Sequence, residues 1–242
     1  MDKGGIVFQS PRMKAMFCML LALPAMAGDL NSLSPEEKTS GWKLLFNGRD
    51  LSNFRAFGSE ARPGEGWKIE QGILTKVPKA KGGHIITKRK YRDYALIWEW
   101  RISEKGNSGI KYLVSEARPN APGPEFQMLD DNGHHDAKNG PTHQTAALYD
   151  ILPPAADKLL KPVGEWNRSR IIVKGNHVEH WLNGSPVVTY ELGSPELLAA
   201  IAKSKFKNAE GFGKKIDGHI MLTDHQDGCE FRNMKILEFP VK

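Results

Sequence analysis

The clearest place for chemistry in this sequence is a short strand-like segment in which polar and apolar side chains alternate. Phe126 and Met128 share one face, which we assign to the core. Glu125 and Gln127 share the other face, and Asp130 closes the strand. A carboxylate beside an amide supplies the acceptors and donors that sugar hydroxyls need. The segment therefore predicts a groove for a polar ligand.

A second alternating run, over residues 95–102, carries another pair of charged side chains. Its large apolar residues fall in one phase, so Glu99 and Arg101 point together out of the opposite face. If this strand neighbours that of Glu125, Glu99 and Glu125 could face one glycosidic bond, as the two acids of a conventional glycosidase do. The alternative is a solvated ion pair on a convex surface.

Further polar residues lie just after the first segment. In the predicted strand 146–151 and the residue before it, Thr145 and Tyr149 share a face with the small Ala147, which again suggests a groove. Residues 130–136, with His143 nearby, contain the atom types of a metal site, but not the spacing of a calcium loop or of a helical His pair. Asp-Asn-Gly is also an ordinary turn, so we expect no cofactor and keep a divalent metal as the alternative.

The elements that must position these residues are short strands. Apolar or alternating runs, broken by Gly, Asn and Pro, follow one another from Trp42 onward and predict an all-β sandwich or barrel. Gly175-Asn176 and Asn183-Gly184 are turn pairs that tolerate positive φ. They predict three consecutive antiparallel strands, over residues 169–174, 177–182 and 187–190.

One helix interrupts the β pattern. Ser194 can cap it, Pro195 suits its first position, and apolar residues recur at helical spacing up to Phe206. We therefore predict a single short helix inserted near residues 194–206. Earlier in the chain, Ser34-Pro35-Glu36-Glu37 has the form of a capping box and predicts one helical turn.

The N-terminus indicates export. Lys3, Arg12 and Lys14 precede an apolar run that ends in Ala25-Met26-Ala27, the pattern of a secretory signal peptide. We divide the chain into a signal peptide over 1–27, a linker over 28–40 and a single domain over 41–242. The product is expected in the periplasm or outside the cell, without a membrane anchor once the signal is cleaved.

Composition narrows the function classes. Of the two cysteines, Cys18 lies in the predicted signal, so Cys229 has no intrachain partner and the domain must depend on a large core. The formal net charge of +6 is spread among interleaved acids, which does not match the basic stripe of a nucleic-acid binder. No nucleophile elbow, phosphate loop or dinucleotide fingerprint occurs.

Several segments resemble a known family when they are taken in order. They are 45–51 (Leu-Phe-Asn-Gly-Arg-Asp-Leu), Trp67 in a Trp-x-Ile-x-x-Gly stretch, 107–110 (Asn-Ser-Gly-Ile), 125–130 (Glu-Phe-Gln-Met-Leu-Asp), 164–167 (Gly-Glu-Trp-Asn), 181–184 (Trp-Leu-Asn-Gly) and 231–233 (Phe-Arg-Asn). Together they look like the 3-keto-disaccharide hydrolase domain family over nearly the whole mature chain. The resemblance implies a concanavalin A-like jelly roll of two antiparallel sheets, with a small-molecule or oligosaccharide substrate on the concave face. It also implies hydrolysis of glycosides whose sugar carries a ketone at C3.

The resemblance also suggests roles for single residues. Glu125 becomes the first candidate for acid or base, with Glu99, His143 and His225 as candidate partners. The segment around His225, Thr223-Asp224-His225-Gln226-Asp227-Gly228, departs from the family's Gln–His–Gly-like pattern. Arg101 and Arg232 are assigned to the ketone and the enolate, and the remaining substrate-binding candidates are Asn107, Gln127, Asp130 and Tyr149.

Three function classes stay open at this point: a 3-keto-glycoside hydrolase, a conventional two-carboxylate glycosidase, and a lectin-like module that binds sugar without cleaving it. Glu125 buried in an open groove, with a second titratable group nearby, would favour an enzyme. Aromatic platforms on a flat face, without such a pair, would favour a lectin.

Export is directly testable. N-terminal sequencing or intact-mass measurement of the protein recovered from an expressing host should give a mature chain that begins near Gly28. Recovery of the full-length chain from the cytosol would contradict the predicted signal peptide.

Overall fold

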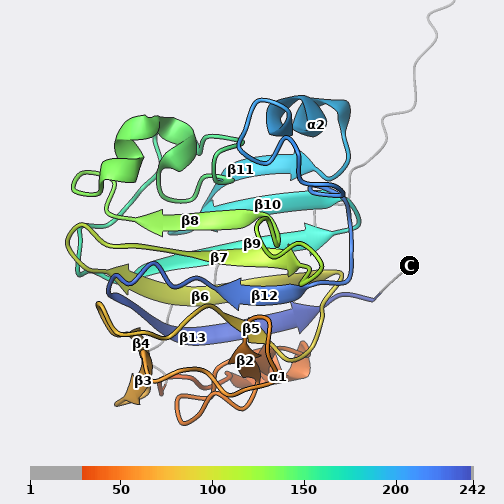
Figure 1. The fold of residues 1–242 in the computed structure, drawn as a ribbon. Coiled ribbons are helices and arrows are strands. Elements are labelled where there is room, and N and C mark those ends of the chain that lie inside the picture. Colours follow the sequence, from red (N-terminus) through yellow and green to blue (C-terminus); the bar gives the residue numbers. More distant parts are fainter. Residues whose placement is uncertain (1–28, 241–242) are drawn as a thin grey trace, which may run out of the picture.

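Two antiparallel sheets lie face to face in the computed structural model, which describes residues 29–240 (Figure 1). The larger, eight-stranded sheet has the order β11 (Ser185–Glu191), β10 (His177–Leu182), β9 (Asn167–Lys174), β6 (Tyr94–Ile102), β13 (Cys229–Glu238), β4 (Ile73–Lys76) and β3 (Trp67–Glu70), and β1 (Lys43–Leu44) also pairs with β13. The five-stranded sheet has the order β2 (Phe54–Ala56), β5 (Ile85–Thr87), β12 (His219–Leu222), β7 (Asn107–Val114) and β8 (Glu125–Leu129). The predicted fold class, an all-β sandwich of two antiparallel sheets, is confirmed.

The core between the sheets is aromatic where β6 faces β8. The rings of Trp98 and Phe126 meet edge to face with centroids 5.0 Å apart, and the Trp98 indole donates to Met128 Sδ at 3.3 Å. All three side chains are fully buried. Because neighbouring residues on a strand point to opposite faces, this contact directs Glu99 and Glu125 away from each other. Cys229 is buried as well, as a free thiol.

The predicted three-strand meander is confirmed. β9, β10 and β11 pair in sequence, and the turn residues Gly175 and Asn183 have φ values of +59° and +47°. The predicted strand 146–151 is wrong. Ala146 and Asp150 adopt φ values of +69° and +61°, which break an extended chain, so this segment forms turns with isolated bridges through Leu148.

The helices are short. α2 (Pro195–Ile201) begins where predicted, with Ser194 Oγ accepting from the Leu197 amide, but it ends before Phe206. Its last carbonyl, that of Ile201, accepts from both the amide and the hydroxyl of Ser204, which turns the chain. Two 3-10 helices, η1 (His135–Asn139) and η2 (Pro141–His143), follow β8. No helix within residues 29–240 is long and apolar enough to cross a membrane.

The segment before the domain packs against it. α1 (Pro35–Thr39) has the predicted capping box at Ser34. The buried Asn31 exchanges hydrogen bonds with Asn233, its amide donating at 2.8 Å and its side-chain oxygen accepting at 2.9 Å. Residues 29–40, predicted as a linker, are therefore attached to β13, whereas the predicted signal peptide over 1–27 lies outside the described residues.

This attachment predicts a stability effect. Asn31→Ala should lower the free energy of unfolding by about 1–3 kcal/mol, because it leaves the Asn233 amide on β13 and the Gly72 carbonyl without their side-chain partner. Ser32→Ala is the control, because that hydroxyl bonds only an exposed carbonyl. Urea unfolding followed by fluorescence measures both, and equal stabilities for the two variants would show that the Asn31 side chain contributes nothing.

Candidate active site

Three of the predicted site residues lie together on the outer face of the five-stranded sheet. Glu125 and Gln127 point outward from β8, since Phe126 and Met128 point inward. On β7, the register pairs Lys111 with Glu125 and Gly109 with Gln127, which places Asn107, at the start of the same strand, on the same face. The site is thus built on the two strands at one edge of the sheet.

Glu125 is a buried carboxylate surrounded by cationic groups. Its Oε2 lies 3.4 Å from Lys111 Nζ, and its Oε1 lies 4.0 Å from His225 Nε2. Burial alone raises the pKa of Glu125, but Lys111, His225 and Lys205 outweigh it and lower the pKa to about 2. The carboxylate is therefore ionised at neutral pH, which is the protonation state that a general base needs.

This face also holds polar atoms that have no partner. Within the described chain, only five side-chain nitrogen or oxygen atoms are buried without a hydrogen bond, and three of them are Glu125 Oε1, Gln127 Oε1 and Asn107 Oδ1. An unmade hydrogen bond at a buried polar atom costs about 1–3 kcal/mol, so three such atoms on one face indicate a ligand that donates to them. Hydroxyl groups of a sugar are donors of this kind.

Gly109 makes room for the carboxylate. A Cβ atom at this position would lie 2.2 Å from Glu125 Oε1. Only glycine therefore lets the Glu125 side chain lie across the backbone of β7 beside Lys111. The glycine of the Asn-Ser-Gly segment is thus required by the site itself and not by the turn that precedes it.

Tyr149, Lys205 and His84 complete the surroundings. The Tyr149 amide donates to the Glu125 carbonyl at 3.1 Å, and the Lys205 ammonium lies 4.1 Å from the centre of the Tyr149 ring. His84 Nδ1 accepts from the Asp224 amide at 2.9 Å, so a neutral His84 carries its proton on Nε2. Burial and the nearby Lys111 lower the pKa of His84, which keeps the ring neutral.

A family model described as the 3-keto-alpha-glucoside-1,2-lyase-like domain matches residues 41–237. The chain belongs to this family. It is also 30% identical, over 241 residues covering 87% of this chain and 82% of the relative, to a protein of Bacteroides thetaiotaomicron named 3-keto-disaccharide hydrolase.

Solved structures agree with this assignment. The chain is similar to a proposed glycosyl hydrolase from Parabacteroides distasonis, with a TM-score of 0.79 and 31% identity over 88% of this chain and all of that one. A second such protein from the same organism gives a TM-score of 0.62 at 27% identity, over 82% of this chain and 99% of that one. The predicted family, jelly-roll fold and glycoside hydrolase class are confirmed.

Three of the predicted residues are not at this site. Glu99, Arg101 and Arg232 lie on the outer face of the eight-stranded sheet, so the two sheets separate them from Glu125. Glu99 pairs with Arg232 at 2.7 Å, and Arg101 pairs with Glu230. The proposed pairing of Glu99 with Glu125 and the roles of the two arginines at a ketone are therefore wrong, because the strands belong to different sheets and their polar faces point apart.

His143 is close to the site but does not face it as a free base. Its Nδ1 and Nε2 each lie 3.0 Å from a carboxylate oxygen, of Asp136 and Asp150 respectively. Asp136 also binds the Tyr149 hydroxyl, and the pKa of Tyr149 is raised to well above 10 by burial and by this carboxylate. His143 therefore holds the segment that carries Tyr149 and is not one of the groups that meet Glu125.

Asp130 has a structural role. Its carboxylate accepts from the amides of Lys105, Asn132 and Gly133, at 2.9 to 3.1 Å. Asp131 and Asp136 are likewise bound to other protein groups, so the carboxylates of segment 130–136 diverge. Within residues 29–240, no group of three or more His, Cys, Asp or Glu side chains is arranged to hold a metal ion.

Four residues at this site, Gly109, Lys111, His84 and Lys205, are not among those predicted from the sequence. The position of Lys111 could have been predicted, because alternation along β7 places Lys111 and Asn107 on the same face, which is also the face of Gln127. His84 precedes a strand, and Lys205 follows α2, so neither has a periodic pattern that predicts where its side chain lies.

The Gly109 contact predicts a pKa effect. Gly109→Ala should displace the Glu125 carboxylate from Lys111, raise its pKa toward the ordinary 4.5 and lower any activity that needs the carboxylate in this position. Ser108→Ala is the control, because Ser108 points inward and bonds the Thr223 carbonyl. Carboxyl carbon NMR during a pH titration measures the pKa, and an unchanged value in Gly109→Ala would contradict this role of the glycine.

The lowered pKa of Glu125 also sets the pH range in which the free energy of unfolding depends on this residue. Since the folded-state pKa is lowered, the stability contributed by ionised Glu125 is present above the ordinary pKa near 4.5 and is lost as the pH falls toward about 2. Glu125→Gln should therefore reduce the pH dependence of the unfolding free energy within this window.

Proposed function

We propose that this protein hydrolyses the glycosidic bond of 3-keto-glycosides, including 3-keto-disaccharides. The observation that carries the proposal is the ionised, buried Glu125 beside two further unpartnered acceptors, Gln127 Oε1 and Asn107 Oδ1. Family membership and the named relative support the same substrate class. The description of the family as lyase-like also fits an elimination as the first half of the reaction.

In the first step, Glu125 acts as the general base. A ketone at C3 makes the C2 proton acidic, so the carboxylate takes this proton and the electron pair of the C2–H bond forms an enolate. Lys111 and Lys205 are the nearby cations that offset the charge developing on the enolate oxygen. They replace Arg101 and Arg232 in this role. The His225 side chain, which is 39% exposed, lies 4.0 Å from Glu125 Oε1 and is the titratable group next to it on the solvent side.

In the second step, the enolate collapses and expels the leaving group. The C3 carbonyl re-forms, a C1–C2 double bond is made, and the C1–O bond breaks as His225 gives a proton to the departing oxygen. Water then adds across this double bond, with hydroxyl at C1 and hydrogen at C2. The sum of elimination and hydration is hydrolysis of the glycoside.

The conventional two-carboxylate glycosidase has less support. Glu99 is on the opposite face, and the other acids around the site are engaged: Asp136 and Asp150 by His143, and Asp224 by Lys76. A lectin has less support as well. The buried Glu125 carboxylate lies beside a second titratable group, His225, and such pairs are typical of catalytic sites. We further propose that the protein acts in the periplasm or outside the cell, on the basis of the signal pattern over residues 1–27.

The mechanism predicts a loss of turnover. Glu125→Gln should lower kcat on a 3-keto glycoside by roughly 10²–10⁴-fold, the usual contribution of a positioned base, with a much smaller change in substrate binding. Glu99→Gln is the matched control on the other sheet and should leave kcat within about twofold. Steady-state kinetics measures both, and full activity of Glu125→Gln would remove Glu125 from the catalytic role.

The substrate itself tests the chemistry. The parent glycoside, which lacks the ketone, should be cleaved poorly by the wild type, because its C2 proton is not acidic. Deuterium at C2 should slow cleavage of the 3-keto substrate where proton removal limits the rate. Equal cleavage of the parent and the 3-keto glycoside would favour the two-carboxylate mechanism, and sugar binding without any turnover would favour a lectin.

A further inference from the structure

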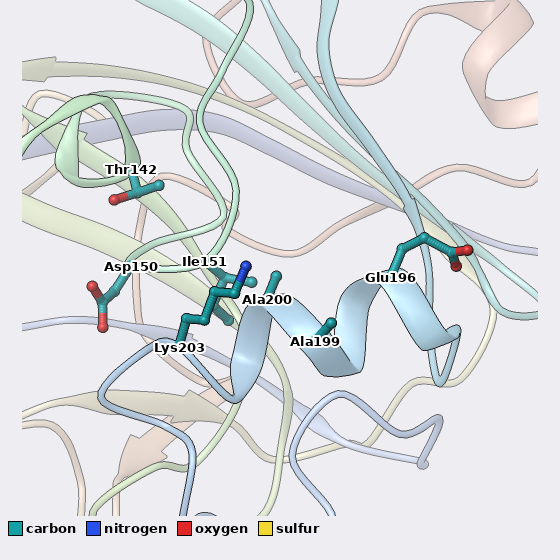
Figure 2. A pocket seen from close by; sticks show the side chains of 7 residues that line it. All are labelled: Thr142, Asp150, Ile151, Glu196, Ala199, Ala200 and Lys203. Atoms are coloured by element: carbon teal, nitrogen blue, oxygen red, sulfur yellow. The ribbon is translucent and has the colours of Figure 1, made fainter.

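A separate hollow of about 430 Å³ opens between α2 and the segment that runs from η2 to Ile151. Figure 2 shows its lining residues, with Thr142, Asp150 and Lys203 gathered near the end of α2 and Glu196 near the beginning. Ala199, Ala200 and Ile151 complete the wall. Its volume falls in the range of about 300–1,000 Å³ that is typical of small-molecule sites.

This hollow adjoins the catalytic face through Tyr149 and Asp150. Tyr149 is bonded through its amide to the Glu125 carbonyl, and the next residue, Asp150, already lines the hollow. Asp150 also accepts from the Lys205 amide at 2.7 Å, which fixes the backbone after α2. From this short stretch of backbone, Lys205 contributes positive charge near Glu125, and Lys203 lines the hollow. A substrate seated over Glu125 therefore has this hollow as a neighbour.

The side chains that line the hollow determine which kind of ligand can bind there. Glu196 and Lys203 line the hollow as exposed charged side chains, and Thr142 adds a hydroxyl. Between these polar ends the helix presents only small alanine side chains, against which a sugar ring can lie. None of the lining residues is aromatic, so the wall offers no stacking partner for an aryl group.

We propose that this hollow is the subsite for the leaving-group sugar, a neutral monosaccharide unit, of a 3-keto-disaccharide. The proposal rests on the proposed function for the position of the reacting bond, with the keto sugar over Glu125 and the second sugar between α2 and Asp150. Glu196 accepts from its hydroxyls, and Lys203 and Thr142 donate to them. The enzyme then prefers disaccharides to 3-keto glycosides with a small aglycone.

The subsite can be tested by a substitution that fills the hollow without changing a core residue. Ala199 is exposed on α2, so Ala199→Trp should occupy the hollow, and Leu198→Trp, at the neighbouring exposed position outside it, is the matched control. Ala199→Trp should lower kcat/KM for a 3-keto disaccharide by roughly tenfold or more, and leave kcat/KM for the methyl 3-keto glucoside within about twofold. Leu198→Trp should leave both values unchanged. Equal losses on the two substrates, or no loss on either, would overturn the subsite.

A binding measurement separates this proposal from the proposed function. Glucose, added to wild-type protein labelled with ¹³C at alanine methyl groups, should shift the signals of Ala199 and Ala200, and in Ala199→Trp the shift at Ala200 should disappear. If the wild type cleaves neither 3-keto substrate, the proposed function fails, and the glucose titration still decides the subsite. Absence of any shift at Ala200 in the wild type would exclude a sugar from this hollow.

Discussion

The arrangement of the site depends on keeping one ionised carboxylate out of water. Removing a carboxylate from water is costly unless a cation and hydrogen-bond donors replace the solvent. For Glu125 the cation is Lys111, directly opposite on the neighbouring strand, with His225 and Lys205 adding positive charge. The donors are incomplete, because Oε1 has none. A ligand that supplies them relieves this deficit, so the protein is arranged to gain from binding a polyhydroxylated molecule.

The two sheets make this arrangement rigid. β8 is anchored from inside by the contacts of Phe126 and Met128 with Trp98, and a closely packed core permits little rotation of the strand. Glu125 and Gln127 are then held outward by alternation alone. Gly109 allows the Glu125 side chain to lie across β7, and the Tyr149 amide, bonded to the Glu125 carbonyl, fixes the edge of β8. Backbone geometry therefore sets the position of the Glu125 carboxylate, the proposed base.

Much of this could be predicted from the sequence, and the limits have physical causes. Local alternation and turn chemistry predicted the meander over 169–190, the inward and outward faces of β8 and the beginning of α2. Alternation predicts which way a side chain points but not which sheet its strand joins. Glu99 was therefore considered as a partner of Glu125, whereas β6 and β8 belong to different sheets and the two side chains lie on opposite faces of the sandwich. The turns over 146–151 and the position of Lys205 depend on tertiary contacts, such as the hydrogen bond from Lys205 to Asp150, that leave no periodic signal in the sequence.

The two outer faces of the sandwich show why unpaired polar groups are more informative than polar groups as such. On the eight-stranded sheet, Glu99 is bonded to Arg232, and both Arg232 and Arg101 lie over the ring of Trp166, at 4.0 and 4.9 Å. These charges satisfy one another, and a ligand placed there would have to replace contacts that are already made. On the five-stranded sheet Glu125 Oε1 is buried without a hydrogen-bond partner, and Gly109 leaves the space that this oxygen occupies. The face with unpaired buried polar atoms is the one that gains hydrogen bonds from a ligand, and this difference between the two faces, more than the residue types, supports the proposed active site.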